Sequence, residues 1–568
     1  MLNTFSGRRP SLLLSALAIL ASHFAATAQT SVTFVANSTD QGTEVQVLEL
    51  SLAQTVELVL RHNLQVRIAA LNPDLSEEQI RSARAQFDPV FVFNLPQAFT
   101  RNTQPTSSVL GGADVLSSEQ INGGFQLNAN TRWGLGWSVA ATVSRFVTNN
   151  QFSTFNPRWD TSFDISLRQP ILRNFGEANE RQLLVARNDY SVSRELFRLQ
   201  LQNSIFGVIR AYWNLVSAYS TLAIAEESLA LAEEQHRNNG TRVRIGALAA
   251  VDVIQTEQQV ANAELTLLQA QLAVNNQQDL MRSLLNFDSV VQAGWDVEIV
   301  PTDEPSVEAA EINIEAAVAE ALEKSPTIRQ NRLNLESRKI DLRASHNQLL
   351  PQLDFIGTAS LSGLGGDQIF RSGDIFGNPV VSEVQAGGIG DSFQQLFSGD
   401  FRNWSVGLQL SFPVHNDQAQ AQYAQATIRE RQASTQVEDD EVQIRLGVRN
   451  AARNVTGGVQ QVSAAAAAVD LAERQYAAEL RRFENGAPGT STFTVLNLQR
   501  QLTVARQREL LTTISLNIAL ANFDLNKGTL LERFNVDVDD AGVGGRPLRA
   551  RGAARAQIPA ATTPPGGQ

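Results

Sequence analysis

Long stretches of the sequence carry apolar side chains at the spacing of an α-helix. Between Asn179 and about Asn238, leucine, valine, alanine and tyrosine side chains recur every three or four residues. About 60 residues at 1.5 Å each predict a rod of roughly 90 Å. A second stretch, from about Gln418 to Phe483, has the same character and includes an alanine-rich run. The pattern therefore predicts two very long helices.

Each long helical stretch leads to a glycine and then to another helical pattern. Gly246 precedes apolar and small residues that continue to Val274, and Gly486 precedes a similar stretch that ends near Leu511. A glycine readily takes the left-handed conformation that ends many helices. Small side chains at the contact positions let antiparallel helices approach closely. Two helical hairpins are predicted, and an ordinary soluble helical bundle remains an alternative.

Other segments alternate between apolar and polar residues. In the run from Trp404 to Phe412, every second side chain is large and apolar, and the residues between them are serine, glycine and glutamine. This period of two is typical of an outer-membrane strand with one face toward lipid. A soluble β-sandwich with a buried apolar face is the alternative. Loops at 101–121 and 363–398 are expected to face the exterior. The segment near 125–147 could form an extra hairpin, either inside or outside the wall of a barrel.

The two halves of the chain resemble each other. The segment that begins at Leu50 aligns without a gap on the segment that begins at Ile312, so that Pro89 falls on Pro351. Each half reads as two short helices, a strand pair and a long helical hairpin. A bilayer accepts strands only in a closed barrel, and known barrels have at least eight strands. Two strands per half are therefore too few, and three copies, supplying about twelve strands, are expected.

The start of the chain predicts export. Arg8 and Arg9 precede a short apolar core, and a small-residue cleavage site ends at Ala28. The predicted organisation is a signal peptide at 1–28, a flexible segment at 29–47, a first repeat at 48–300, a linker at 301–311, a second repeat at 312–532 and a disordered tail at 533–568. No later run of eighteen apolar residues occurs, so no transmembrane helix is expected.

Composition excludes several classes of function. The net charge of -12 and the lack of a large basic surface argue against nucleic-acid binding. The five histidines are scattered without metal-ligand spacing, and the chain has no cysteine. No catalytic constellation or cofactor motif is found, so neither an enzyme nor a metal or cofactor site is predicted.

The order of motifs resembles the outer-membrane efflux proteins of the TolC type. The resemblance covers roughly Leu48 to Leu530 and is carried by the duplication together with four short motifs, which are LRQPILRNFG, VIRAYWNLVSA, RVRIGALAAVDVIQTEQQVANAE and RRFENGAPGTSTFTVLNLQRQL. It implies a mixed α and β membrane protein: a homotrimer whose 12-strand outer-membrane β-barrel, embedded in outer-membrane lipid, is continued by a long periplasmic α-helical barrel. It also implies a passive duct that docks a periplasmic adaptor protein and an inner-membrane pump.

The resemblance assigns the helical turns at Gly246 and Gly486 to the periplasmic tips, which dock the adaptor and close the tunnel. In similar proteins acidic residues flank the Val-Leu pair after the second glycine, whereas Thr494 and Asn497 stand here. Asp252 is retained. The positions that pair with it in similar proteins are Phe483 and Pro488 in this chain, so that link is not expected. We therefore expect a less anionic entrance that other contacts hold closed, and the candidate residues for these contacts are Arg242, Arg244, Arg481 and Arg482.

Two functions remain open from the sequence. The first is an export duct for drugs, metals or proteins of a type I secretion system. The second is a periplasmic coiled-coil scaffold that transports nothing. The duct must fractionate with the outer membrane and conduct ions, whereas the scaffold would be released by high salt.

Overall fold

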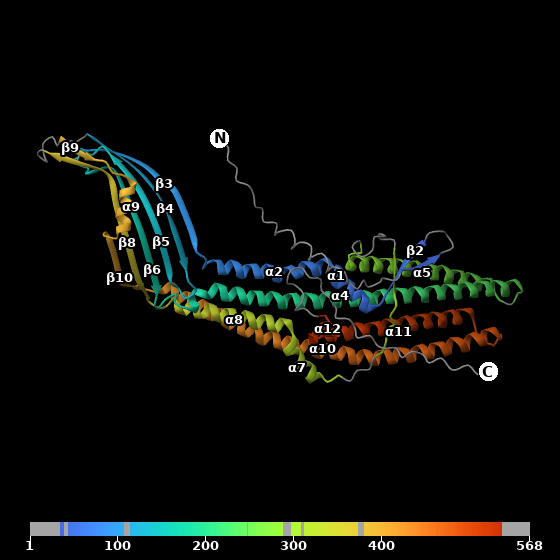
Figure 1. Ribbon diagram of the computed structural model, residues 1–568. Helices are drawn as coiled ribbons and strands as arrows, with labels where there is room; N and C mark the ends of the chain where they lie inside the picture. The colour runs from blue at the N-terminus through green and yellow to red at the C-terminus, as the bar shows by residue number, and fades with distance from the viewer. Residues whose placement is uncertain are drawn as a thin grey trace, which may run out of the picture.

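The computed structural model describes residues 34–38, 44–106, 114–246, 248–287, 297–307, 312–372 and 380–536. The predicted signal peptide and most of the predicted C-terminal tail lie outside the described residues. Within them, none of the helices combines the length and the apolar character needed to cross a bilayer. Figure 1 shows an elongated molecule with a curved sheet at one end and long helices that extend from it.

Four long helices form two antiparallel hairpins, which lie side by side over their length (Figure 1). They are α4 (Glu177–Arg244), α5 (Ala250–Leu285), α10 (Asp417–Glu484) and α11 (Thr492–Lys527). The helices α4 and α10 each have 68 residues, and α5 and α11 each have 36. At 1.5 Å per residue the longer two are about 100 Å long. The two long helices and their return partners, predicted from periodicity, are confirmed.

Two shorter helices precede the sheet segments of each half, four in all. They are α1 (Leu52–His62), α2 (Leu64–Ala85), α7 (Ile314–Lys324) and α8 (Pro326–Asn347). The Ser51 hydroxyl and the Gln54 side chain cap the start of α1 reciprocally, and the Asn63 side chain caps α2. Their lengths of 11, 22, 11 and 22 residues repeat in the same order in the two halves. The helices α2, α4, α8 and α10 pack side by side in that order.

The main sheet is antiparallel, in the order β10-β8-β6-β5-β4-β3. Its strands are β3 (Val90–Pro105), β4 (Val115–Asn130), β5 (Gly136–Thr148), β6 (Phe155–Pro170), β8 (Gln352–Ser372) and β10 (Arg402–Ser411), and the short β9 (Val380–Gln385) pairs with the far end of β8. The expectation of two strands per half is wrong, because the first half supplies four strands. The segment near 125–147 forms β4 and β5, which turn at 131–135 and pair over thirteen residue positions.

The predicted exterior loop at 363–398 also differs from the structure. Its first part continues β8, and its last part forms α9 (Ile389–Ser398). The helix lies close against β8, since a Cβ on Gly363 would lie 1.9 Å from the Ser392 carbonyl oxygen. Glycine is therefore required there by packing, and the glycine-rich run at 362–368 serves the contact between α9 and the sheet.

A smaller sheet and the largest hydrophobic core lie along the middle of the helices. This sheet contains β1 (Phe34–Ser38), β2 (Glu44–Leu50) and β7 (Glu298–Pro301), so part of the segment predicted to be flexible is paired. The core packs α1 against α4 around the fully buried Tyr212. The Tyr212 hydroxyl donates to Asp303 Oδ2 at 2.8 Å, and the same oxygen accepts from the Leu52 amide at 2.6 Å. These bonds tie the start of α1 to the long helix.

Candidate functional site

The main sheet has one apolar face that runs across all six strands. Cross-strand register places on this face Phe91, Phe93, Phe125, Leu127, Trp137, Val139, Phe163, Ile165, Leu353, Phe355, Trp404, Val406 and Leu408. The rings of Phe91 and Phe125 stack across β3 and β4 with centroids 5.9 Å apart. Trp404 is 75% exposed and Phe93 is 63% exposed in the single chain. So large an apolar surface requires lipid or another protein surface.

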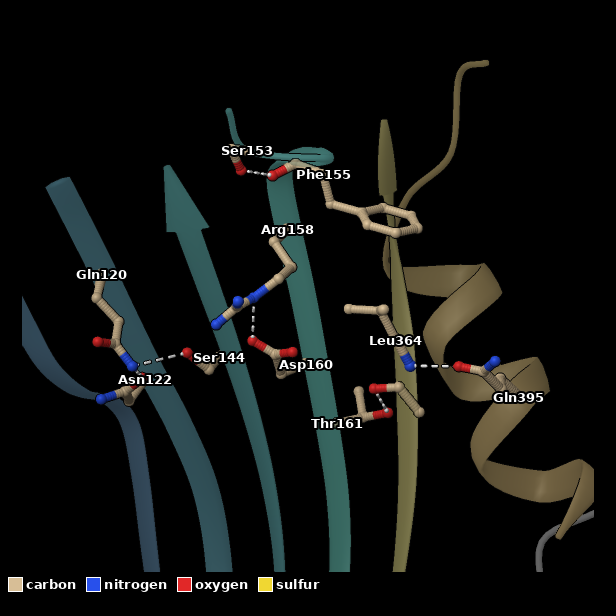
Figure 2. A network of polar contacts seen from close by, with 11 residues as sticks. Gln120, Asn122, Ser144, Ser153, Phe155, Arg158, Asp160, Thr161, Leu364 and Gln395 are labelled. Atoms are coloured by element: carbon tan, nitrogen blue, oxygen red, sulfur yellow. Dashed lines mark hydrogen bonds and ion pairs between the residues drawn. The ribbon is translucent and has the colours of Figure 1, made fainter. Parts of the chain in front are cut away.

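The opposite face is polar, and side-chain hydrogen bonds join neighbouring strands across it. From β4 to β10 the pairs are Gln120 with Ser144 (3.0 Å), Thr142 with Ser162 (2.7 Å), Ser360 with Asp164 (2.6 Å) and Thr358 with Ser405 (2.7 Å). Figure 2 shows part of this network, including the bond of 2.8 Å from Arg158 Nε to Asp160 Oδ2. A hollow of about 820 Å³ lies over part of this network, where Thr142, Ser144, Arg158, Asp160 and Ser162 line it. Such a face is suited to contact with water.

The two edges of the main sheet have no partner strand among the described residues over most of their length. Strand β3 pairs only with β4, and β10 pairs only with β8, within the described part of the chain. Beyond the start of β10, α9 covers the edge of β8, where the Leu364 amide donates to Gln395 Oε1 at 2.6 Å (Figure 2). The open edges β3 and β10 expose backbone groups that need partners if the sheet lies in a bilayer.

The far ends of the long helices form two tips. Gly246 ends α4 with φ +77° and Gly486 ends α10 with φ +67°, so both glycines take the left-handed conformation that the sequence predicts. Arg242 lies over the ring of Phe483, 4.9 Å from the guanidinium carbon to the ring centroid. This contact joins the last turn of α4 to the last turn of α10. It therefore connects the two hairpins near their tips.

The other tip residues predicted from the resemblance make local contacts. Arg244 donates to Gly240 O and Thr241 Oγ1, and Arg482 pairs with Glu479 at 3.1 Å. Asp252 accepts from the Ala249 amide at 3.2 Å and thereby caps α5.

Two further tip residues stabilise α11. The Thr494 amide donates to the Ser491 hydroxyl in the first turn of the helix, and Asn497 accepts from Arg500 at 2.8 Å. Of the predicted tip residues whose side-chain contacts are described, Arg242 is the one that bridges the hairpins.

Two contacts between the hairpins were missed from the sequence. Asn239 is fully buried, and its amide nitrogen lies 3.3 Å from Thr492 Oγ1. Arg506 on α11 pairs with Glu227 on α4 at 3.0 Å and with Glu473 on α10 at 2.8 Å. The Asn239–Thr492 and Arg506–Glu227 pairs join residues more than 250 positions apart, so no local pattern signals them, whereas the Arg506–Glu473 pair lies within the second hairpin. In the described part of the chain, no cluster of three side chains suited to hold a metal ion occurs.

Comparison with known proteins adds a family to this geometry. The sequence profile of the outer membrane efflux proteins matches residues 55–286 and 305–525. No curated protein matches the chain significantly.

Solved structures with a similar fold include three from different bacteria. A membrane protein from Pseudomonas aeruginosa has 18% identity and a TM-score of 0.60, over 84% of this chain and 93% of that protein. The Campylobacter jejuni outer membrane channel CmeC has 14% identity and a TM-score of 0.58, over 84% and 86%. The open-state Neisseria gonorrhoeae channel MtrE has 15% identity and a TM-score of 0.56, over 88% and 96%.

Proposed function

The chain belongs to the outer membrane efflux protein family, and from this premise we propose that three copies assemble into the exit duct of a multicomponent export system. As a member of the family it is an outer-membrane efflux channel that extends into the periplasm, and it is not an enzyme. The trimer, its closed barrel and its partners are the parts that we propose here. Residues 1–28 are proposed to be removed on export.

The observation that carries the proposal is the six-stranded sheet with one apolar face, one polar face and two open edges. A single copy in a bilayer would leave the backbone groups of β3 and β10 without partners, which costs several kcal/mol per group. Pairing β3 of one copy with β10 of the next satisfies both edges. It also turns the apolar face to lipid and the polar hydrogen-bonded face toward a water-filled lumen.

The helices next to the edge strands support the same arrangement. On α2, which leads into the edge strand β3, the side chains of Leu64, Ile68, Leu71 and Leu75 follow one helix face and are between 51% and 62% exposed. On α10, which follows the edge strand β10, Val442 and Leu446 are 55% and 50% exposed. Exposed apolar stripes of this length are costly in water. We propose that they pack against neighbouring copies and so extend the wall into the periplasm.

The tips are proposed to dock the periplasmic adaptor and to form the gate. The glycine turns at Gly246 and Gly486 lie about 100 Å from the sheet end of α4 and α10 at the rise of an α-helix. Arg242 and Phe483 supply a contact between hairpins that would have to separate for the entrance to widen. The adaptor in turn connects the duct to an inner-membrane pump, which supplies the energy.

The test is membrane location together with conduction. The mature full-length protein is expected to fractionate with the outer membrane, to resist extraction by high salt and to give discrete conductance steps in planar bilayers. Release by high salt without conductance would instead indicate a periplasmic scaffold and would contradict the proposal.

A further inference from the structure

We propose that the closed wall of this channel contains eighteen strands, six from each of three copies. The inference rests on the proposed trimer and specifies its barrel. The inference depends on the hairpin formed by β4 and β5, which lies between β3 and β6 in the sheet. The question is whether this hairpin belongs to the membrane wall or stands apart from it.

The side-chain pattern assigns the hairpin to the wall. On the apolar face, Leu127 and Val139 continue the row that Ile165 forms on β6, and Phe91 continues it on β3. On the polar face, Ser138 bonds to Ser166 at 2.7 Å across β5 and β6. The two faces therefore keep the same polarity from β3 to β10. A hairpin outside the wall would expose its apolar face to water and would have no reason to match its neighbours.

The periplasmic turn of the hairpin is fixed to the junction between sheet and helices. Asn179, in the first turn of α4, donates to the carbonyl oxygens of Thr131 and Arg132 at 2.9 and 3.1 Å. The Gly176 amide donates to the Trp133 carbonyl at 3.3 Å. A Cβ on Gly134 would lie 2.7 Å from the Asn174 carbonyl oxygen, so the turn approaches this junction as closely as glycine allows. The turn is thus part of the connection that carries β6 into α4.

Strand lengths and directions also fit a wall of six strands per copy. A tilted transmembrane strand needs about 9–11 residues, and the six strands have between 10 and 21. Neighbours alternate in direction across the sheet, so β3 and β10 run in opposite directions. When β3 of one copy meets β10 of the next, the pairing is antiparallel. Three copies then give an even number of alternating strands, as barrels of this class require.

The width of the sheet matches the width of the helical layer below it. The helices α2, α4, α8 and α10 pack in series, and at about 10 Å per helix they span roughly 40 Å. Six strands about 4.8 Å apart and tilted by about 40° span roughly 38 Å. Four strands would span only about 25 Å by the same geometry. With the β4–β5 hairpin in the wall, the strands and the helices therefore have the same circumference. A barrel of eighteen strands is about 36 Å in diameter, whereas a barrel of twelve strands would be about 24 Å in diameter.

Cysteine cross-linking tests which strands form the two edges of each copy, because the natural chain has no cysteine. On the apolar face, Phe93→Cys on β3 combined with Val406→Cys on β10 is expected to give disulfide-linked dimers and trimers. The pair Phe91→Cys and Leu408→Cys on the same strands tests the alternative pairing register. The matched control combines Val139→Cys on β5 with Val406→Cys. It is expected to give no links, because β5 is paired on both sides within its own copy.

The outcomes separate this inference from the proposed function. Links from β5 to β10, or no links from β3 to β10 in a protein with the native mass of three copies, would overturn the eighteen-stranded wall and leave the channel in place. A monomeric mass would overturn both. Electron microscopy of the unmodified protein gives an independent reading, with a wall about 36 Å across expected and one about 24 Å across contradicting it.

Discussion

Arg242 lies over the ring of Phe483, so a side chain of α4 contacts α10 close to both tips. The sequence placed Phe483 where similar proteins keep a partner for Asp252. It predicted that this link would be absent, and it named Arg242 among the candidates for other contacts. In the structure Asp252 caps its own helix, and Phe483 faces an arginine instead. A contact between hairpins is therefore present near the tips, with chemistry that the resemblance does not supply.

Removing this contact should favour the open entrance. A cation–π contact contributes about 0.5–1 kcal/mol at an exposed site and more where the ring is buried, as Phe483 is, so Arg242→Ala is expected to raise the ratio of open to closed channels by at least about 2–5-fold. Single-channel recording in planar bilayers measures the ratio. Arg244→Ala is the control, since it removes the same charge from a side chain that bonds within its own helix. Equal effects of the two substitutions would show that charge alone matters and that the Phe483 contact does not.

Tyr212 makes the stability of the helical core depend on alkaline pH. Burial raises the pKa of the Tyr212 phenol above its ordinary value near 10, and the hydrogen-bonded Asp303 carboxylate raises this pKa further. In the unfolded chain the phenol ionises above pH 10, whereas in the folded chain it stays neutral. The contribution of Tyr212 is therefore complete below pH 10 and is lost as the pH rises above 10.

The substitution Tyr212→Phe tests this dependence. At pH 8 it should cost about 1 kcal/mol, because the hydroxyl no longer bonds to Asp303 and Leu50. Between pH 10 and 11.5 the difference in apparent melting temperature from the natural protein should shrink, since the variant has no phenol to ionise. A difference that stays constant over this range would contradict the assigned environment.

At the scale of elements, helices were more predictable than strands. The long helices α4 and α10 carry apolar positions through many turns, and their terminal glycines mark where each chain reversal begins. Strand β10 was equally clear, because large apolar side chains alternate with polar ones along it. Strands β4 and β5 contain glycine, alanine and asparagine at many positions, so their alternation is weak. Their assignment to the sheet depends on pairing with β3 and β6, which no local pattern reveals.

The faces of β10 give a prediction with an adjacent control. Val406 lies on the apolar face and Ser405 on the polar face, where Ser405 bonds to Thr358. A lysine toward the middle of the bilayer costs about 2–4 kcal/mol, so Val406→Lys should sharply reduce the amount of assembled protein in the outer membrane. Ser405→Lys should assemble normally, because its side chain would face water in the lumen. The reverse order of the two variants, measured by membrane fractionation and immunoblotting, would place lipid on the other face.

At the scale of the whole molecule, the order of elements is the same in the two layers. The edge helix α2 leads into the edge strand β3, and the edge strand β10 leads into the edge helix α10. The open strand edges and the exposed apolar stripes of the helices therefore lie along the same two sides of each copy. The sequence predicted that a single copy could not satisfy its own strands. It could not predict how wide each copy is, because the number of strands in the wall is set by long-range pairing.

The most direct test of the account is the native mass of the mature protein with and without detergent. Extracted from outer membranes, it is expected to require detergent and to have the mass of three copies, because both the apolar sheet face and the open borders need partners. A water-soluble monomer that is stable without detergent would contradict the account, since it would mean that the sheet buries its apolar face and its edges within one chain.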